Sequence, residues 1–250
     1  VLMSVLMVAM CLLQLTRATA CAQRIDEVLE AQPDIRDGAV PESELPPARG
    51  TVEFKNVSFR YKAGTGDDVL RDINLTVEPG EFVAIIGATG TGKSTLVNLI
   101  PRFYDVSGGS IEVDGLDVRE YPIQALRKRI GMVLQKNVLF TGTIRENLLW
   151  GDKDATEEQM IRAAKDAQAH DFILSLPDGY DTMLEQGGVN VSGGQKQRLC
   201  IARAMLRHPS ILILDDSTSA VDSTTEAEIR RSFHENLKDT TVIIIAQRIS

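Results

Sequence analysis

The glycine-rich segment at residues 87–94 constrains the fold of this chain more than any other part of the sequence. It reads GATGTGKS and matches the pattern G-x-x-x-x-G-K-[ST]. The apolar run FVAII directly precedes it, and KSTLVNLI, at residues 93–100, can form the helix that the pattern requires after it. A strand, a tight turn and a helix in this order predict a sheet with helices packed against it.

The residue types in this segment suit the binding of an anion. Gly87, Gly90 and Gly92 let the backbone curl so that several N–H groups point at one ligand. Lys93, at the start of the helix, would meet the charge of β- and γ-phosphates, and the Ser94 hydroxyl can bind Mg²⁺. The segment predicts a nucleoside-triphosphate site, with a turn that binds nothing as the alternative. The residues expected to contact the nucleotide are Gly87, Thr89, Gly90, Thr91, Gly92, Lys93, Ser94 and Thr95.

A second segment supplies the acidic partner that such a loop needs. The run ILILD, at residues 211–215, reads as an apolar strand that ends in Asp215. The Asp215 carboxylate would hold Mg²⁺ directly or through water. An apolar strand ending in Asp usually marks only a strand end, but here it accompanies the glycine-rich loop.

Three further segments give the chain a resemblance to ATP-binding cassette (ABC) proteins. The sequence VSGGQKQR, residues 191–198, closely resembles the signature motif of that family. Residues 199–216 and the sequence SAVD, residues 219–222, resemble the signature helix, the Walker B strand and the D-loop. Gln135 matches the Q-loop, and Tyr61 matches the aromatic residue that stacks on adenine. The resemblance covers the chain from about residue 50 to its last residue.

This resemblance implies an α/β fold: a phosphate-loop NTPase core of three layers, with an antiparallel β subdomain and an α-helical subdomain. We expect core strands in FVAIIG, IGMVLQ, ILILD and TVIIIA, and antiparallel strands near residues 51–80. The helical subdomain is expected at about residues 136–205, with helices in TIRENLLW, ATEEQMIRAAKDAQ and SGGQKQRLCIARAML. The resemblance also implies ATP and Mg²⁺ as ligands.

Each matched position also has an ordinary structural explanation. Tyr61 would stack on adenine, or it is only part of the fold at a strand end. The Gln135 amide would meet Mg²⁺ or the attacking water, or it caps a strand beside a loop. Ser192 and the N–H groups after it would face a γ-phosphate, or Ser192 is an N-cap, and both can hold at once. The signature residues assigned to nucleotide binding are Ser192, Gly193, Gly194 and Gln195.

The resemblance also implies a partner. In ABC ATPases, two ATP-binding domains close head to tail around two ATP molecules, and each site pairs one domain's phosphate loop with the other domain's signature. One domain alone completes neither site, so we expect a second half-transporter subunit. Closure would be transmitted to membrane helices by the region around the Q-loop and residues 136–190.

Two residues depart from the family pattern at positions that act on water. The chain has Asp216 where hydrolytic sites have Glu, and the shorter side chain draws the carboxylate back. It has Gln247 where the family has its switch histidine, and an amide carries no positive charge. We expect the chain's own site, with Asp216, Gln247 and Gln135 as catalytic positions, to bind ATP and hydrolyse it slowly. This pattern resembles the degenerate-site subunit of a heterodimeric exporter of the multidrug type.

The first 48 residues are expected to lie outside the ATP-binding domain. Residues 1–15 read VLMSVLMVAMCLLQL, with no charge, whereas a bilayer span needs about 20 apolar residues. We expect residues 1–24 to be the truncated end of the last transmembrane helix, with a signal peptide or a buried soluble helix as alternatives. Residues 25–48 are rich in proline and acidic residues and are expected as a linker. The ABC domain then occupies residues 49–250.

Charge and cysteine usage exclude some partners. Lys plus Arg number 27 and Asp plus Glu 35, giving a net charge of −8, so we expect no binding to nucleic acid. The three cysteines lack the spacing of a disulfide framework or a zinc site. Trp150 and the three histidines are expected in surface or packing roles. We expect a multi-pass protein of the cell membrane with its ATP-binding domain on the cytoplasmic side. A soluble ABC ATPase and an ATP-controlled dimerisation module are the alternative functions.

Overall fold

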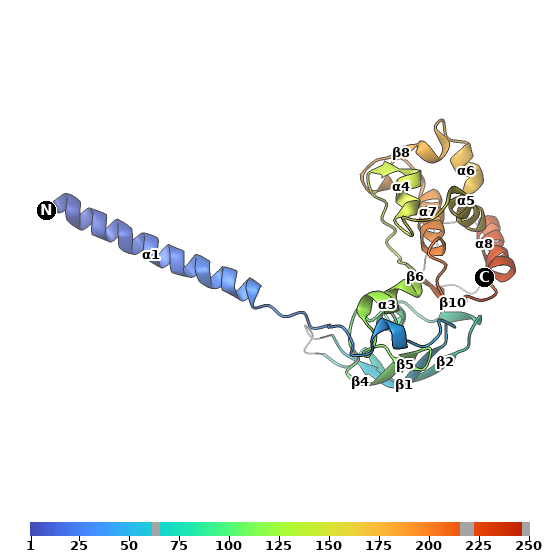
Figure 1. Cartoon of the computed structure of the whole chain (residues 1–250), viewed down its shortest axis with the longest axis horizontal. Coiled ribbons are helices and arrows are strands. Elements are labelled where there is room, and N and C mark those ends of the chain that lie inside the picture. Colours follow the sequence, from blue (N-terminus) through green and yellow to red (C-terminus); the bar gives the residue numbers. More distant parts are fainter. Residues whose placement is uncertain (62–65, 216–222, 247–250) are drawn as a thin grey trace. The chain divides into compact units, whose positions relative to one another are not determined.

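The computed structural model describes residues 1–61, 66–215 and 223–246 of the chain (Figure 1). Contacts between residues divide the chain into two units, Val1–Arg36 and Asp37–Ser250. The predicted domain boundaries after residues 24 and 48 stay predictions.

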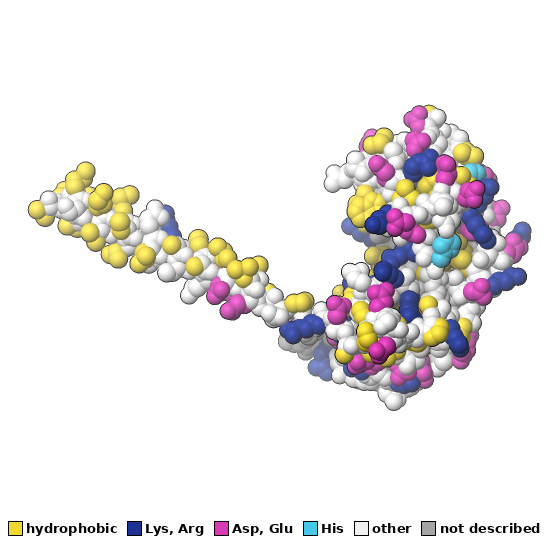
Figure 2. Space-filling model, viewed as in Figure 1, with side chains coloured by type: hydrophobic (Ala, Val, Ile, Leu, Met, Phe, Trp, Pro, Cys, Tyr) yellow, Lys and Arg dark blue, Asp and Glu magenta, His cyan; other side chains and the backbone are white. Residues whose placement is uncertain are grey.

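One long helix, α1 (Leu2–Leu29), makes up most of the first unit. Its most apolar stretch has a mean hydropathy of 1.7, and the helix is long and apolar enough to cross a membrane. None of its residues is buried, and Figure 2 shows hydrophobic side chains along its length. The helix ends four residues before Pro33, as expected because proline disfavours a helical residue before it.

A parallel sheet of four strands forms the middle of the second unit. Its strands pair in the order β3-β10-β9-β6. Their bounds are β3 (Phe82–Ile86), β6 (Ile130–Val133), β9 (Ile211–Asp215) and β10 (Thr241–Ala246), which confirms the four predicted core strands. Because parallel strands share one carboxyl-terminal edge, the residues that follow β3, β6 and β9 meet there.

Helices cover this sheet on two faces. They are α2 (Lys93–Leu99), α3 (Ile123–Lys128), α7 (Gly193–Met205) and α8 (Ser223–Asn236). On β9, Leu212 and Leu214 belong to the same buried cluster as residues of α7 and α8. The alternate residues Ile211 and Ile213 pack instead with α2 and α3. This period of two is the expected pattern for a strand between two layers.

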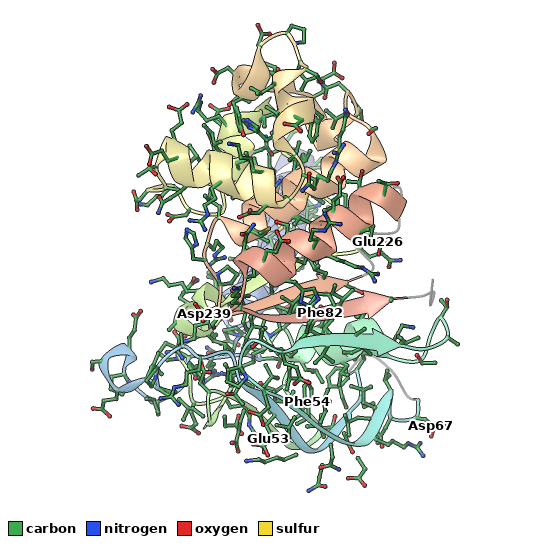
Figure 3. The ribbon with its side chains drawn as sticks, turned by 90° about the vertical axis from the view of Figure 1, so that its right-hand side faces the viewer. Glu53, Phe54, Asp67, Phe82, Glu226 and Asp239 are labelled. Atoms are coloured by element: carbon green, nitrogen blue, oxygen red, sulfur yellow. The ribbon has the colours of Figure 1, made fainter. Side chains whose placement is uncertain are left out.

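A second, antiparallel sheet completes the core. Its strands are β1 (Val52–Phe59), β2 (Leu70–Val77), β4 (Gly108–Val113) and β5 (Leu116–Asp117), in the order β2-β1-β4-β5. In Figure 3, Phe54 on β1 lies on the opposite side of Phe82 from Glu226 on α8. The α/β core of three layers is therefore confirmed. Strands β1 and β2 confirm the prediction near residues 51–80, whereas β4 and β5 were not predicted.

The segment between β6 and β9 is mainly helical, as predicted. It contains α4 (Ile144–Leu149), α5 (Glu157–Asp166), α6 (His170–Leu174) and α7, with the short strands β7 (Gly142–Thr143) and β8 (Met183–Leu184). The predicted helices are confirmed as α4, α5 and α7, and each begins with a capping box. The five-residue helix α6 and the β7-β8 pair were not predicted. Single 3₁₀ turns occur at Glu42–Glu44, Gly179–Asp181 and Gln186–Gly188.

The proline-rich segment before β1 is fastened to the body of the second unit by a buried ion pair. Asp114 lies in the turn between β4 and β5, and its Oδ1 accepts hydrogen bonds from the backbone N–H groups of residues 49–51 at 2.7 to 3.2 Å. Its Oδ2 accepts from Arg129 Nη1 at 2.9 Å, and Arg129 Nη2 donates to the Pro46 carbonyl at 2.7 Å. The Arg129 guanidinium also lies 5.3 Å from the centre of the Tyr121 ring. We call Asp114, Arg129 and Tyr121 the Asp114 cluster.

Tyr121 makes the stability of this cluster dependent on alkaline pH. The residue is fully buried, its hydroxyl donates to the Val113 carbonyl at 2.7 Å, and burial raises the pKa of the phenol to about 12. The unfolded phenol has a pKa of about 10. The buried, protonated Tyr121 phenol therefore contributes fully to the free energy of unfolding below pH 10, and this contribution is lost as the pH rises to about 12. The difference between a pKa of about 12 in the folded protein and about 10 in the unfolded chain corresponds to roughly 2–3 kcal/mol of unfolding free energy.

We therefore expect Tyr121→Phe to flatten the dependence of the unfolding free energy on pH above about pH 9. Urea unfolding of both proteins at several alkaline pH values measures that difference. An equally steep loss in Tyr121→Phe would show that other groups cause it.

Candidate functional site

The phosphate loop, residues 87–94, connects β3 to α2 through glycines in the left-handed region. Gly90 and Gly92 have φ values of 85° and 86°. A Cβ atom at Gly92 would lie 3.2 Å from Val69 Cγ1, so both the backbone angle and the space favour glycine. The Leu96 N–H donates to the Gly92 carbonyl at 2.8 Å and starts the helical ladder. The N–H groups before it are available for an anion.

Lys93 is held against the phosphate loop. Its Nζ donates to the carbonyls of Gly87 and Ala88, both at 2.7 Å. The Thr91 hydroxyl donates to the same Ala88 carbonyl at 2.9 Å. These bonds keep a positive charge within the curve of the loop, where a phosphate group would lie.

Ser94 and Asp215 meet at the carboxyl-terminal edge of the parallel sheet, although they are 121 positions apart. Ser94 Oγ donates to Asp215 Oδ1 at 2.9 Å, and Asp215 is only 5% exposed. A hydroxyl and a carboxylate fit Mg²⁺, which proteins commonly hold through one or two carboxylates together with phosphate oxygens and water. Within residues 1–61, 66–215 and 223–246, no three His, Cys, Asp or Glu side chains could hold a metal together. A cation at Ser94 and Asp215 would therefore depend on the phosphates of a ligand.

A pocket of about 250 Å³ lies at this edge of the sheet. Val69 and Ile245 supply apolar walls. The structure brings eight predicted site residues together here: Thr89, Gly90, Gly92, Lys93, Ser94, Thr95, Gln135 and Asp215. Gly87 and Thr91 belong to the loop without lining the pocket. Gln135, an exposed residue just beyond β6, thus lies beside the phosphate loop as expected, while its catalytic role stays a prediction.

Tyr61 lies next to the phosphate loop rather than in the lining of the pocket. Its hydroxyl and Thr95 Oγ1 are 3.0 Å apart. Its ring meets the rings of Phe59 and Tyr104 nearly at right angles, with centroids 4.8 and 5.2 Å away. The predicted adenine-stacking residue is therefore part of an aromatic cluster that borders the loop.

The signature residues lie at the start of α7, away from the phosphate loop. Ser192 Oγ accepts from the Gln195 N–H at 3.2 Å, and Gln195 Oε1 accepts from the Ser192 N–H at 2.9 Å, so Ser192 is an N-cap. The other end of α7 reaches β6, where a Cβ atom on Gly131 would lie 3.0 Å from the Ala204 carbonyl oxygen. With 13 residues, α7 spans roughly 20 Å between these ends. None of Ser192, Gly193, Gly194 and Gln195 lines the pocket with the phosphate loop.

Two predicted catalytic positions lie outside the described residues. Asp216 follows the last residue of β9, and Gln247 follows the last residue of β10. The D-loop match at residues 219–222 lies outside them as well. The roles assigned to these positions stay predictions from the sequence.

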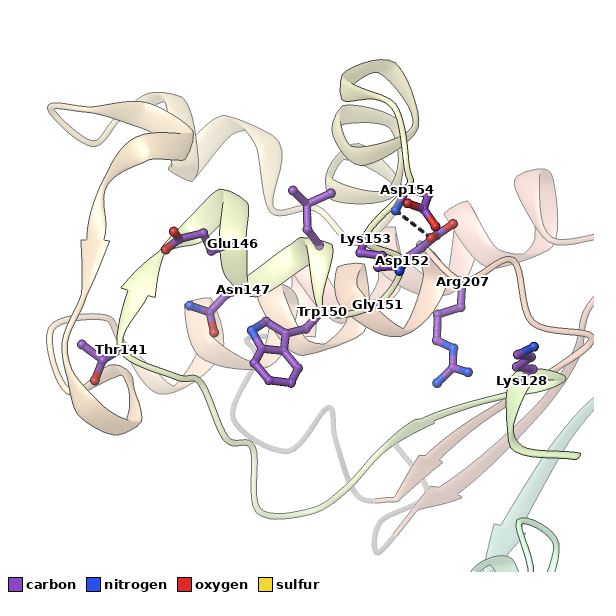
Figure 4. A pocket seen from close by; sticks show the side chains of 11 residues that line it. Lys128, Thr141, Glu146, Asn147, Trp150, Gly151, Asp152, Lys153, Asp154 and Arg207 are labelled. Atoms are coloured by element: carbon purple, nitrogen blue, oxygen red, sulfur yellow. Dashed lines mark hydrogen bonds between the residues drawn. The ribbon is translucent and has the colours of Figure 1, made fainter. Parts of the chain in front are cut away.

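Sequence reasoning missed a larger cavity beside the helical segment. It measures about 1020 Å³ and is bordered by Trp150, Asp152, Lys153 and Arg207, among others (Figure 4). Figure 4 labels Trp150 among the residues that line this cavity, and the residue is 68% exposed. A tryptophan this exposed is unusual for a residue with only a packing role.

Trp150 belongs to an apolar surface with three other exposed side chains. Its ring stacks on Phe140 at 4.9 Å, and the Arg203 guanidinium lies 5.7 Å from the Phe140 ring. Leu134 and Val138 are about half exposed and line, with Trp150, a neighbouring cavity of about 220 Å³. We call Leu134, Val138, Phe140 and Trp150 the Trp150 surface. Clustered exposed apolar side chains of this kind mark interaction sites.

Comparison with known proteins identifies the family of this chain. The family model described as "ABC transporter" matches residues 70–219. The ATP-dependent lipid A-core flippase of Syntrophus aciditrophicus is 46% identical over 235 residues, which cover 92% of this chain and 38% of the flippase. The putative multidrug export ATP-binding/permease protein YgaD of Bacillus subtilis is 46% identical over 238 residues, covering 94% of this chain and 40% of YgaD.

A solved structure is similar over nearly the whole chain. The structure of a bacterial Atm1-family ABC exporter with ATP bound superposes with a TM-score of 0.85 and 34% sequence identity. The match covers 93% of this chain and 40% of the exporter chain. The present chain thus spans about two fifths of the length of the curated relatives it matches.

Proposed function

The chain belongs to the ABC transporter family, and from this premise we propose that it is the ATP-binding part of an exporter that couples ATP-driven closure of two such domains to transport across a membrane. The contact between Ser94 and Asp215, in one pocket with Lys93, carries the proposal. These groups have the charge and the ligand types that Mg²⁺ and a triphosphate require.

We assign the residues of this pocket roles toward ATP. The loop N–H groups and Lys93 would bind the β- and γ-phosphates, and Tyr61 would contact adenine. Ser94 and Asp215, together with Gln135, would hold Mg²⁺, which supplies positive charge against the phosphoryl oxygens when it is bound. Each of these side chains except Tyr61 lines the pocket.

Hydrolysis at this chain's own site is proposed to be slow. A general base must lie within about 2.6–3.2 Å of the proton that it removes, and losing such a base costs about 10²–10⁴ in rate. Asp216 is one methylene shorter than the Glu of hydrolytic sites, and Gln247 replaces a histidine that can carry charge. Both differences concern the water molecule rather than ATP itself.

The signature residues are proposed to complete the active site of a second subunit. Ser192 Oγ accepts a hydrogen bond from Gln195, which leaves its own O–H as a donor for a phosphate. The N–H groups of Gly193 and Gly194 belong to the first turn of α7 and have no carbonyl partner within that helix. Since this end of α7 does not line the chain's own pocket, the phosphate that it meets would belong to a partner. We propose a heterodimer, because a degenerate site requires a partner that hydrolyses ATP.

The Trp150 surface and the cavity beside it are proposed to receive the membrane domain. The Trp150 surface spans residues 134–150 and so lies in the region around the Q-loop and residues 136–190, where the family resemblance implies that closure is transmitted. A segment of the membrane domain that covers Trp150 and the stacked Phe140 would bury apolar surface against two rings of fixed geometry. The charged residues around the cavity, Asp152, Lys153 and Arg207, would orient that segment.

We propose that α1 crosses a membrane and that the second unit lies on its cytoplasmic side. The helix is apolar and without buried residues, and the relatives named above include a permease protein and a flippase. These observations favour an exporter over a soluble ABC ATPase. A module in which ATP controls only dimerisation is the second candidate, and Asp216 and Gln247 are what favour it.

ATP binding by the chain itself tests the proposal. We expect ATP with Mg²⁺ to bind and to be hydrolysed slowly at low protein concentration, because no partner signature is present. We expect Lys93→Ala to weaken ATP binding by about 10- to 100-fold, since it removes a charge-assisted hydrogen bond to phosphate. Titration calorimetry measures the affinity, and phosphate release measures turnover.

Lys165→Ala, on the exposed side of α5, is the matched control and should leave the ATP affinity unchanged. Equal affinities in the Lys93 and Lys165 variants would reject the assigned phosphate site. Fast hydrolysis at low protein concentration would reject the requirement for a second subunit.

A further inference from the structure

We propose that the Tyr61 hydroxyl positions the Thr95 hydroxyl as a hydrogen-bond donor to the phosphates of the nucleotide. Tyr61 would then act on both ends of the ligand, on adenine through its ring and on phosphate through Thr95. This inference rests on the proposed function of the pocket as an ATP site.

The two hydroxyls are placed for such a relay. Tyr61 Oη and Thr95 Oγ1 lie 3.0 Å apart, and Thr95 is only 8% exposed. Thr95 follows Ser94 in the first turn of α2 and lines the same pocket as Lys93. Thr95 is thus in contact with Tyr61 and borders the phosphate site at the same time.

The direction of the Tyr61–Thr95 hydrogen bond decides what Thr95 offers to the pocket. A hydroxyl has one proton to donate, so Thr95 can donate either to Tyr61 or to a ligand. Phosphate oxygens only accept, and an anion in the pocket therefore favours Tyr61 as donor to Thr95 and Thr95 as donor to phosphate. Two hydroxyl bonds in series also strengthen one another, because each polarises the next.

The aromatic neighbours make this hydroxyl separable from the ring. Phe59 and Tyr104 meet the Tyr61 ring at interplanar angles of 83° and 87° and fix its position. Phenylalanine at position 61 would keep these ring contacts and any stacking on adenine while removing the donor. The Thr95 hydroxyl, without its partner, can then turn to a backbone carbonyl one helical turn earlier, as threonines in helices commonly do.

Binding of ATP and of tripolyphosphate, each with Mg²⁺, tests the relay, because tripolyphosphate has no base to stack. We expect Tyr61→Phe to weaken both ligands equally, by about 3- to 10-fold, in titration calorimetry of the full chain in detergent micelles. Tyr61→Leu should weaken ATP further but tripolyphosphate no more than Tyr61→Phe does. Thr95→Ser, which keeps the hydroxyl, should bind tripolyphosphate within about twofold of the unsubstituted chain.

The decisive comparison is made in the Thr95→Val background. Since Tyr61 acts on phosphate only through Thr95, adding Tyr61→Phe there should change tripolyphosphate affinity by less than about twofold. Unchanged tripolyphosphate binding in Tyr61→Phe alone, or losses that multiply in the double variant, would overturn the relay. If the unsubstituted chain binds neither ligand, the proposed ATP site itself fails, which is a different result from a neutral Tyr61→Phe.

Discussion

In a full-length transporter assembled with the proposed partner subunit, Ser192→Arg should abolish most ATPase activity, whereas Asp216→Ala should barely change it. Ser192 is proposed to donate to the phosphate in the partner's hydrolytic site, and loss of one such donor typically lowers the rate by about 10²–10³. The arginine side chain also fills the space in front of the first turn of α7. Asp216 belongs to the site that is proposed to hydrolyse ATP slowly, so we expect its removal to change the total rate by less than about twofold.

Phosphate release by the assembled transporter measures both effects, and Thr156→Arg is a matched control. Thr156 is the N-cap of α5 and forms the same kind of capping box, with Gln159, that Ser192 forms with Gln195. Losing either cap costs about 0.5–2 kcal/mol of stability, but only Ser192 has a proposed role toward ATP. A similar loss of activity in Thr156→Arg would reduce the Ser192 effect to helix stability.

The contrast between Ser192 and Asp216 also shows whether this chain is the subunit with the degenerate site or the subunit with the hydrolytic site. If Asp216→Ala is the crippling change, this chain carries the hydrolytic site and the degenerate-site hypothesis is wrong. If both substitutions abolish activity, the two sites depend on one another at every turnover, and the proposed asymmetry is wrong as well.

The phosphate site could be predicted because its information is local. The spacing of Gly87, Gly90, Gly92, Lys93 and Ser94 lies within one turn between a strand and a helix, so eight letters of sequence define it. Its long-range contact, between Ser94 and Asp215, was also predictable. Both residues follow or end strands of one parallel sheet, whose carboxyl-terminal edge collects such residues.

Contacts without a local pattern could not be predicted. The sequence Asp114-Gly115 reads as an ordinary hairpin turn, and nothing in it announces a carboxylate that accepts three backbone hydrogen bonds from residues 49–51. The same holds for the bond between Tyr61 and Thr95, because the pairing depends on how β1 approaches α2. Trp150 was assigned a surface or packing role, and only tertiary structure shows that its exposed ring stacks on Phe140 beside a cavity.

Secondary-structure elements could likewise be predicted where the sequence has a local pattern and not where it has none. The long periodic or continuously apolar segments were predicted, including all four strands of the parallel sheet. Strands β4 and β5 were missed because Gly108, Gly109 and the turn at residues 114–115 interrupt a short and mostly polar run. Strand β4 is stabilised by pairing with β1, a contact across fifty or more residues, and β5 by pairing with β4, rather than by their own composition.

Asp114→Asn should lower the free energy of unfolding of the second unit by about 3–5 kcal/mol, the largest effect on stability that we expect from a single conservative change. The Asp114 and Arg129 side chains are 2% and 13% exposed. Asparagine keeps the shape of the side chain and tolerates the left-handed φ of 53° at this turn, so the backbone cost is small. What is lost is the negative charge, which leaves the Arg129 guanidinium buried without its counter-charge.

Urea unfolding measures this effect against two further variants. Asp67→Asn breaks the ion pair with Arg71, in which the Asp67 side chain is 95% exposed and that of Arg71 65%. This variant should lower the free energy of unfolding by less than about 0.5 kcal/mol. Combining Asp114→Asn with Arg129→Met removes the uncompensated charge, so this double variant should be more stable than Asp114→Asn alone. Equal stabilities for the Asp67 and Asp114 variants would contradict the buried ion pair.

Hydrogen exchange separates a global loss of stability from a local release of the segment before β1. The three amides bound to Asp114 Oδ1, at residues 49–51, should lose protection in Asp114→Asn by a larger factor than the amides of the central strand β9. Uniform loss of protection across both would mean that the Asp114 cluster stabilises the whole body without fastening this segment in particular. A larger local effect would show that the Asp114 carboxylate, beyond its part in overall stability, fastens residues 49–51 to the body of the second unit.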